Sequence, residues 1–325
     1  MRLATLRDGS RDGKLLVVSR DGLRAIDASA AATSLRAALD DWERTEPSLR
    51  RLEQALDRDT RAAFELDVAA LAAPLPRATE WIDGSAYLNH VRLVRRARHA
   101  DPPATLEMDP LVYQGGSSDM LGPREPFRLL DPAYGLDFEA ELGVILSDTP
   151  RGTRAEAAAS HVRLLACLND WTYRALVPDE LAKGFGFFCS KPATAFAPFV
   201  VTPDEFGSAW VDGKLHGTMV VSVDGVKVGQ PETGAEMHFS FFDLIQHICR
   251  TRSFGAGTVL GSGTISNAAP ERGITCLQER RALETIASGA PQTPFLRPGQ
   301  HVRIEFLLPN GHAPFGSIQQ EVIPA

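Results

Sequence analysis

One stretch of the sequence bears on both the fold and the chemistry. It is Asp137-Phe138-Glu139-Ala140-Glu141-Leu142-Gly143-Val144-Ile145-Leu146. Its second half is an apolar, β-branched run typical of a buried strand. Its first half alternates acids with apolar residues, so Glu139 and Glu141 should lie on one strand face, about 6–7 Å apart at Cα. Two parallel carboxylates repel each other, and oxygen ligands favour a hard cation such as Mg²⁺, Ca²⁺ or Mn²⁺. A solvated strand face explains the pair equally well.

The composition excludes several classes of protein. The chain has 325 residues, 44% of them hydrophobic and 23% charged, which is enough for a full core and for two domains. The net charge of -7 and the absence of a Lys/Arg-rich block argue against a nucleic-acid partner. No apolar run reaches the roughly 18 residues of a membrane span, and the first residues lack the apolar segment of a signal peptide. We therefore expect a cytoplasmic protein without a membrane partner.

The four cysteines, Cys167, Cys189, Cys249 and Cys276, lack C-x-x-C spacing. Scattered thiols of this kind fit buried side chains in a reducing compartment better than zinc ligands or disulfides. We expect four free thiols that bind no metal.

The sequence predicts two domains, a small one over residues 1–78 and a catalytic one over residues 79–325. The run Leu71-Ala72-Ala73-Pro74-Leu75-Pro76 breaks helices and strands alike and is typical of a linker. In the first domain, Leu15–Val18 indicates a strand, and residues 35–42 and 48–56 indicate helices.

Local signals in the second domain predict further elements. Thr153-Arg154-Ala155-Glu156 resembles a capping box that opens a helix to about Leu165. Asp224-Gly225 indicates a hairpin turn, and Ser240 is expected to cap a helix that ends near Arg252. Residues 255–267 are rich in Gly, Ser and Thr and indicate a loop.

Several polar residues are candidates for a site, each with an ordinary alternative. Asp83 and His90 are seven residues apart, the distance of two helical turns, but a lone histidine near arginines is more often structural. Tyr113 opens a run of small polar residues that suits a loop beside a ligand, or a plain turn. Asp170 ends the apolar run from Leu164 and is a candidate third metal ligand, although Asn-Asp is common in turns.

The chain lacks the G-x-S-x-G, H-E-x-x-H and G-x-x-x-x-G-K-[ST] motifs of other enzyme classes. Its acids, in contrast, occur in a recognisable order. Residues 79–325 resemble the fumarylacetoacetate hydrolase superfamily in the combination of Asp-Phe-Glu-Ala-Glu-Leu, Asn169-Asp170-Trp171 and Ser190-Lys191-Pro192. Residues 1–78 are more loosely similar to the small leading domain of longer members.

The resemblance implies a fold and a set of roles. The fold is α+β, a mixed β-sheet roll of the fumarylacetoacetase C-terminal type with peripheral helices, preceded by the small N-terminal domain, usually in a homodimer. Asp83, Glu139, Glu141 and Asp170 would hold one divalent cation, Mg²⁺ before Ca²⁺ or Mn²⁺. His90 would be the general base that activates water, oriented by Glu279.

The resemblance also assigns substrate contacts, which are Tyr113, Lys191, Gly263, Thr264 and, less directly, Arg98. The chain departs from the family after Trp171, where Val177 replaces a glutamine that donates to an oxyanion. Another donor must then act, or the substrate must differ.

The function that follows is hydrolysis of a C–C bond in a β-diketo acid, either fumarylacetoacetate or a related acylpyruvate. Two alternatives stay open. One is a sister reaction that also passes through an enolate, namely hydration, decarboxylation or tautomerisation. The other is a catalytically silent metal-binding protein. A contact between His90 and Glu279 would favour hydrolysis over the sister reactions.

Overall fold

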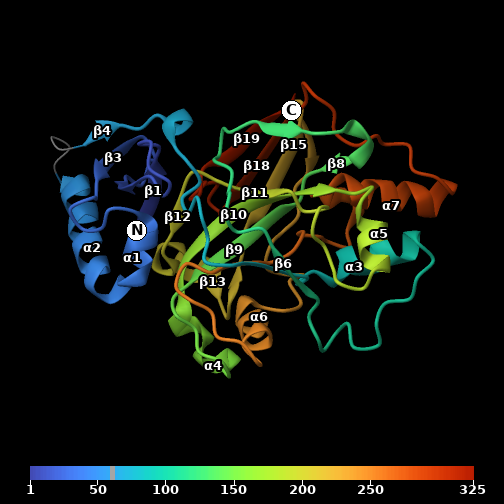
Figure 1. Ribbon diagram of the computed structural model, residues 1–325, viewed down its shortest axis with the longest axis horizontal. Helices are drawn as coiled ribbons and strands as arrows, with labels where there is room; N and C mark the ends of the chain where they lie inside the picture. The colour runs from blue at the N-terminus through green and yellow to red at the C-terminus, as the bar shows by residue number, and fades with distance from the viewer. Residues whose placement is uncertain (59–62) are drawn as a thin grey trace.

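The computed structural model describes residues 1–58 and 63–325. Two large sheets and a peripheral set of helices make up the described part (Figure 1). The larger sheet has the strand order β4-β3-β2-β1-β12-β10-β9-β17-β5-β6, with β8 and β11 also paired to β10. The smaller sheet has the order β16-β15-β18-β19-β7, and β13 (Trp210–Val211) and β14 (Lys214–Leu215) form a separate pair.

Residues 1–58 form one end of the molecule, on the left in Figure 1. Three short strands are followed by two helices, which bury apolar side chains such as Leu39 and Leu49. These elements are β1 (Arg2–Leu6), β2 (Lys14–Val18), β3 (Arg24–Asp27), α1 (Leu35–Asp40) and α2 (Trp42–Arg58), and β4 (Phe64–Glu65) then pairs with β3. Strand β1 pairs with β12 (Val200–Val201), which in turn pairs with β10, so the large sheet runs through both parts of the chain. The boundary at residue 78 stays a prediction.

The centre of the large sheet is the pair β9 (Ala140–Leu146) and β10 (Val162–Tyr173). All seven residues of β9 are buried, as expected for a strand covered on both faces. Neighbouring strands are β5 (Trp81–Gly84), β6 (Val112–Gly115), β8 (Leu136–Asp137), β11 (Ala193–Phe196) and β17 (Val259–Gly261). The pairing of β17 with β5 is parallel and that of β17 with β9 is antiparallel, which makes the sheet mixed.

The small sheet packs on the large one, with β15 in contact with β9 and β18 in contact with β10. Side chains from both sheets, including Leu142, Val221 and Ile304, share one hydrophobic core. The strands are β7 (Phe127–Leu129), β15 (Thr218–Val223), β16 (Val226–Gly229), β18 (His301–Leu307) and β19 (Ser317–Pro324). The predicted hairpin is present, because Val223 pairs with Val226 across Asp224-Gly225.

The remaining helices lie around the sheets. Helices α3 (Leu88–Ala97), α5 (Val177–Ala182) and α7 (Leu277–Ser288) gather at the end opposite the N-terminal strands (Figure 1). Helices α4 (Ala155–Ala158) and α6 (Phe241–Ile248) lie together at a second edge. Within the described ranges no helix is long and apolar enough to cross a membrane.

The predicted α+β class is confirmed, and several local predictions need correction. Residues 155–165 do not form one helix, since α4 ends at Ala158 and β10 begins at Val162. Thr153 caps nothing and instead donates to the Pro150 carbonyl. The expected loop over residues 255–267 contains β17, and Tyr113 lies in β6. Ser240 does cap α6, in a complete capping box with Asp243, although the helix ends at Ile248.

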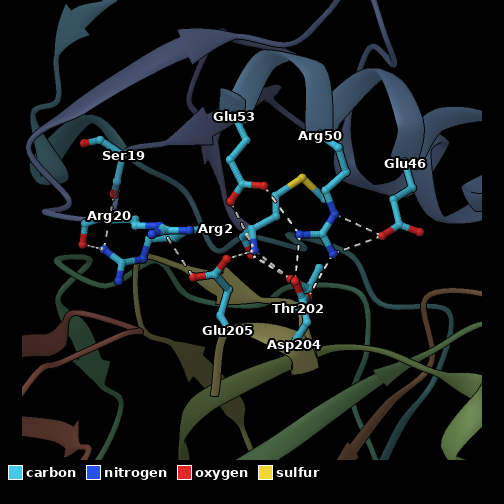
Figure 2. A network of polar contacts seen from close by, with 10 residues as sticks. Arg2, Ser19, Arg20, Glu46, Arg50, Glu53, Thr202, Asp204 and Glu205 are labelled. Carbon is cyan, nitrogen blue, oxygen red and sulfur yellow. Dashed lines mark hydrogen bonds and ion pairs between the residues drawn. The ribbon is translucent and has the colours of Figure 1, made fainter. Parts of the chain in front are cut away.

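An ion-pair network links α2 to the segment that follows β12 (Figure 2). Arg50 donates two hydrogen bonds to the Asp204 carboxylate, at 3.0 and 2.9 Å, and also bonds Glu46. Burial alone would raise the pKa of Asp204, but the bonds from Arg50 and Thr202 lower it to about 2. This contact is bidentate, with two guanidinium nitrogens bonded to the two carboxylate oxygens, and is therefore more specific in geometry than an ion pair with one hydrogen bond.

Replacing Arg50 with Met should lower the free energy of unfolding by about 1 kcal/mol at pH 7. Because the Asp204 pKa is lowered in the folded protein, the pair stabilises the fold above about pH 4. The difference from the wild type should therefore shrink as the pH falls from about 4 toward 2. Urea unfolding at several pH values measures it. Arg44→Met, which removes an exposed pair with Asp41, is the control and should change stability by less than about 0.5 kcal/mol.

Candidate active site

Three carboxylates meet where the central strands of the large sheet run side by side. Asp83 lies on β5, Glu141 on β9 and Asp170 on β10. Strand β17 joins β5 to β9, and β9 pairs directly with β10, with Glu141 opposite Leu168. One oxygen of each carboxylate lies within 4.8 Å of the other two, and all three residues are buried. The structure thus brings together three of the four acids that the sequence analysis proposed as metal ligands.

The fourth acid, Glu139, lies just before β9 and is bound by two cations. Arg174 donates to its Oε1 at 2.7 Å, and the Lys191 ammonium contacts its Oε2 at 2.5 Å. Lys191 also reaches Asp170 Oδ2 at 2.6 Å. Burial alone would raise the pKa of Glu139, but the charges of Arg174 and Lys191 outweigh burial and hold that pKa well below its usual range. Glu139 is therefore neutralised by protein side chains, and its role as a metal ligand stays a prediction.

Glu141 has the opposite surroundings. It is fully buried, and neither of its carboxylate oxygens has a hydrogen-bond partner in the part of the chain that the structure describes. Burial, together with the charges of Asp83 and Asp170, raises its pKa well above the ordinary value. Burial and the charge of Asp170 likewise raise the pKa of Asp83 to about 8. A buried carboxylate without a partner costs free energy, and a divalent cation bound to these oxygens would remove that cost. The residues present fit such an ion.

His90 and Glu279 meet beside this cluster although 189 residues separate them in the chain. Helix α3 carries His90 and packs against α7, which carries Glu279 in its first turn. The distance from His90 Nδ1 to Glu279 Oε1 is 2.9 Å. The histidine side chain is 18% exposed and the glutamate 4%. With Nδ1 engaged, Nε2 is the ring nitrogen left to exchange a proton. Asp83 and His90 lie on a strand and on the following helix, not on one helix as their spacing suggested.

Two residues that the sequence analysis did not assign connect the acids to this pair. The fully buried Asp137 carboxylate accepts hydrogen bonds from the backbone N–H groups of Leu277 and Gln278, at 2.7 and 2.9 Å. These are the first residues of α7, so Asp137 satisfies donors that the helix cannot use itself. Arg174 bonds Asp137 at 2.8 Å and Glu139 at 2.7 Å, and so bridges the two acids. Asp137 shares the acidic stretch with Glu139, but no sequence signal pointed to its helix.

The predicted substrate contacts border one small cavity of about 140 Å³. Tyr113, Lys191, Gly263, Thr264 and Arg98 all line it, together with Asp83, Glu139 and His90. The Tyr113 hydroxyl also donates to Asp170 Oδ2. Gly263 approaches Gly84 so closely that a Cβ would lie 2.2 Å from the Gly84 oxygen, and its φ is +74°. Its backbone N–H donates to Asp83 at 2.9 Å, so glycine is required there to hold the acid.

Val177 lines the same cavity, at the start of α5. It cannot donate the hydrogen bond expected from a glutamine. Arg174 and Lys191 line the cavity as well and are the donors that could replace it. All four cysteines are free, as expected, but Cys189 is exposed and not buried as the sequence suggested. Cys276 nevertheless lies with His90 and Glu279 in a group whose ligand atoms are within 4.8 Å, so the expectation that no thiol binds metal stays a prediction.

Comparisons with known proteins agree with this fold. Residues 79–323 match the family model of the fumarylacetoacetate hydrolase C-terminal domain, and residues 1–77 match fumarylacetoacetase N-terminal domain 2. The chain belongs to the fumarylacetoacetate hydrolase family. It is 25% identical over 268 residues to a fumarylacetoacetase of Dictyostelium discoideum, covering 66% of this chain and 62% of that protein.

Two further proteins, named for different activities, are similar to this chain, one in sequence and one in fold. A mitochondrial oxaloacetate tautomerase of Xenopus laevis is 24% identical over 197 residues, 58% of this chain and 59% of that protein. The chain thus spans about three fifths of the length of both curated relatives. A maleylpyruvate hydrolase from Sphingobium sp. SYK-6, solved in complex with a manganese(II) ion and pyruvate, superimposes with a TM-score of 0.67 at 18% identity and full coverage of both chains. The members of this family are enzymes, and hydrolases are among them.

Glu141→Gln should weaken the binding of Mg²⁺ or Mn²⁺ at least about tenfold, because it removes the charge of a carboxylate that has no hydrogen-bond partner within residues 1–58 and 63–325. In the wild type the affinity should rise with pH up to about 8, since the raised pKa values of Glu141 and Asp83 mean that binding releases protons. Titration calorimetry measures both effects. Glu156→Gln, which changes an exposed acid, is the control. Equal affinities in the two variants would contradict the assignment.

Asp137→Asn should lower the free energy of unfolding by about 3 kcal/mol, because it leaves Arg174, whose side chain is only 10% exposed, with one charged partner fewer and weakens the cap of α7. Urea unfolding measures the loss. Asp131→Asn is the matched control, because Asp131 is exposed and caps only the three-residue turn Pro132–Tyr134. Its cost should stay below about 1 kcal/mol. If Asp137→Asn lowers the free energy of unfolding by no more than Asp131→Asn does, the buried contacts of Asp137 do not stabilise the fold.

Proposed function

We propose that this protein is a metal-dependent hydrolase that cleaves a C–C bond in a β-diketo acid, either fumarylacetoacetate or a related acylpyruvate. The observation that carries the proposal is the 2.9 Å contact between His90 and Glu279 beside the cluster of Asp83, Glu141 and Asp170. Enolate formation alone needs a cation and a base. Hydrolysis also needs an activated water, and a histidine oriented by a carboxylate is a common device for that task.

In the proposed reaction, His90 takes a proton from water while Glu279 stabilises the resulting imidazolium. The water oxygen forms a bond to one carbonyl carbon, and the bond between that carbon and the adjacent CH₂ breaks. The electron pair stays on the CH₂ carbon, which leaves as an enolate and takes up a proton. An acylpyruvate would give a carboxylic acid and pyruvate, and fumarylacetoacetate would give fumarate and acetoacetate.

Asp83, Glu141 and Asp170 are the residues proposed to hold a divalent cation, with Glu139 as the fourth candidate. Carboxylate oxygens suit Mg²⁺, Ca²⁺ and Mn²⁺ alike, and Mg²⁺ is the first candidate by the family resemblance. When bound, such an ion would polarise the substrate's oxygens as a Lewis acid. Lys191 and Arg174 place two further positive charges at the same cavity. Their side chains are suited to stabilise negative charge that develops on the substrate.

Tautomerisation of an oxo acid is the second candidate, favoured by the similarity to the oxaloacetate tautomerase. It requires proton transfer at carbon without an attacking water, so the two functions differ in their products. The purified protein with Mg²⁺ or Mn²⁺ should be given an acylpyruvate while enol absorbance, pyruvate and the free acid are followed together. Release of both products supports hydrolysis. A change in absorbance without either product would move the assignment to tautomerisation.

A homodimer is the proposed assembly, on the basis of the family resemblance. Light scattering of the purified protein tests it. The expected mass is twice the 35.2 kDa of the chain.

Replacing His90 with Gln should lower kcat by roughly 10²–10⁴-fold while Mg²⁺ affinity and thermal stability stay nearly unchanged, because a general base contributes about that factor. Glu279→Gln should act in the same direction but less severely. The double variant should be little slower than His90→Gln alone, since groups that act as one unit do not contribute additively. A loss below about tenfold in His90→Gln, or full additivity of the two changes, would argue that another group activates water.

A further inference from the structure

The small cavity borders a second, larger one. This outer chamber has a volume of about 520 Å³ and shares eight lining residues with the inner cavity, which are Asp83, Ser85, His90, Val94, Arg98, Tyr113, Leu181 and Phe187. The residues that line only the outer chamber come from three places, namely α3, the segment entering β6, and the loop after α5. They are Val91, Arg95, Ala100, Leu111, Val112 and Gly186.

The chamber walls are mostly apolar. Leu111, Val112 and Leu181 line it and are 37%, 41% and 44% exposed, which is unusual for large apolar side chains. Phe187 forms another part of the wall, held edge-on against Tyr113 with 5.3 Å between the ring centroids. Apolar surface left to water beside a reactive site is typical of a surface that a ligand covers.

The inner cavity carries more charged residues than the outer chamber. Asp83 and Arg98 border both cavities; the walls found only in the inner cavity add Glu139, Arg174 and Lys191, whereas the walls found only in the outer chamber add Arg95. Its guanidinium donates to the backbone carbonyl of Asp101 at 3.0 Å. A ligand that spans both cavities should therefore be polar at one end and largely uncharged at the other.

We propose that the outer chamber binds an apolar acyl group, so that the substrate is an acylpyruvate whose acyl chain is an extended aliphatic or aromatic group without a charge at its far end. This inference rests on the proposed function for the position of the diketo acid in the inner cavity. The acyl group then extends past Val94 and Leu181 into the chamber. A short acetyl group would leave the chamber walls exposed, and a terminal carboxylate would have to be desolvated among apolar side chains.

The test compares three probes with the Mg²⁺-loaded protein, which are acetylpyruvate, hexanoylpyruvate and succinylpyruvate. Hexanoylpyruvate carries four more methylenes than acetylpyruvate, and a fully buried methylene is worth roughly fourfold in affinity. Because the chamber is partly open, we expect hexanoylpyruvate to bind at least about 30-fold more tightly than either other probe. Calorimetry with the His90→Gln protein measures binding without turnover, and pyruvate release by the wild type gives kcat/KM.

Two variants examine the walls directly. Leu181→Asn and Leu111→Asn should each lower the ratio of kcat/KM for hexanoylpyruvate over acetylpyruvate by at least about fivefold. Both side chains are partly exposed, so the fold should tolerate the changes. Leu130→Asn is the matched control, because Leu130 is 70% exposed and lines neither cavity, and its ratio should equal that of the wild type.

The outcomes separate this inference from the proposed function. Tight binding of hexanoylpyruvate without pyruvate release would support the chamber and overturn the hydrolase. If the protein releases pyruvate but its kcat/KM for acetylpyruvate equals or exceeds that for hexanoylpyruvate, the result would support the hydrolase and overturn the assignment of the chamber. Preference for succinylpyruvate would overturn the apolar assignment in favour of a charged tail bound by Arg95 or Arg98. Binding of none of the probes would overturn both.

Discussion

The arrangement of the site depends on an imbalance of buried charge. Five acids are buried around the ends of the central strands, namely Asp83, Asp137, Glu139, Glu141 and Asp170, and two cations, Arg174 and Lys191, lie among them. Buried charges are tolerated when they are paired and hydrogen-bonded. These two cations form ion pairs with Asp137, Glu139 and Asp170. Glu141 receives no such partner among the described residues, and Asp83 receives only a backbone N–H. The protein thus neutralises one side of the cluster itself, and the other side, with Glu141 and Asp83, is where we propose that a divalent cation binds.

Arg174 connects the acidic cluster to the pair of His90 and Glu279 through a series of hydrogen bonds. It bridges Glu139, at the acidic cluster, and Asp137, which holds the first turn of α7. Helix α7 carries Glu279, and Glu279 bonds His90 on α3. A shift of α7 would therefore disturb the buried ion pairs, and loss of an ion pair would release the helix. Hydrogen-bonded support of this kind holds reacting groups in position at little further entropic cost.

Local sequence patterns predicted a helix or strand correctly where the local preference agrees with the tertiary contacts of the segment. They failed where tertiary contacts override the local preference. The alternation in Asp137–Leu146 and the Asp224-Gly225 turn were sufficient to predict β9 and the hairpin. Residues 155–165 are alanine-rich and suggest a helix, but Val162–Leu168 is needed as the strand beside β9, and this tertiary pairing decides its state. The contact between His90 and Glu279 followed from the family resemblance, because no local rule relates residues 189 positions apart. Asp137 was missed for the same reason, since the helix that it caps begins 140 positions later.

Helix α3 relates the chemistry of the site to its choice of substrate. His90 and Val94 are four residues apart on one helix face, and Arg98 follows at the C-cap; all three border both cavities. Val91 and Arg95 lie on the neighbouring stripe and face only the outer chamber. An acyl group that packs on α3 therefore contacts the same rigid element that carries the proposed base. Binding energy gained far from the reacting carbon can in this way be used to orient the carbonyl toward His90, which raises kcat as well as affinity. A substrate too short to reach Val91 would lose both effects, so specificity in this site is expected to appear in the rate of the chemical step and not in KM alone.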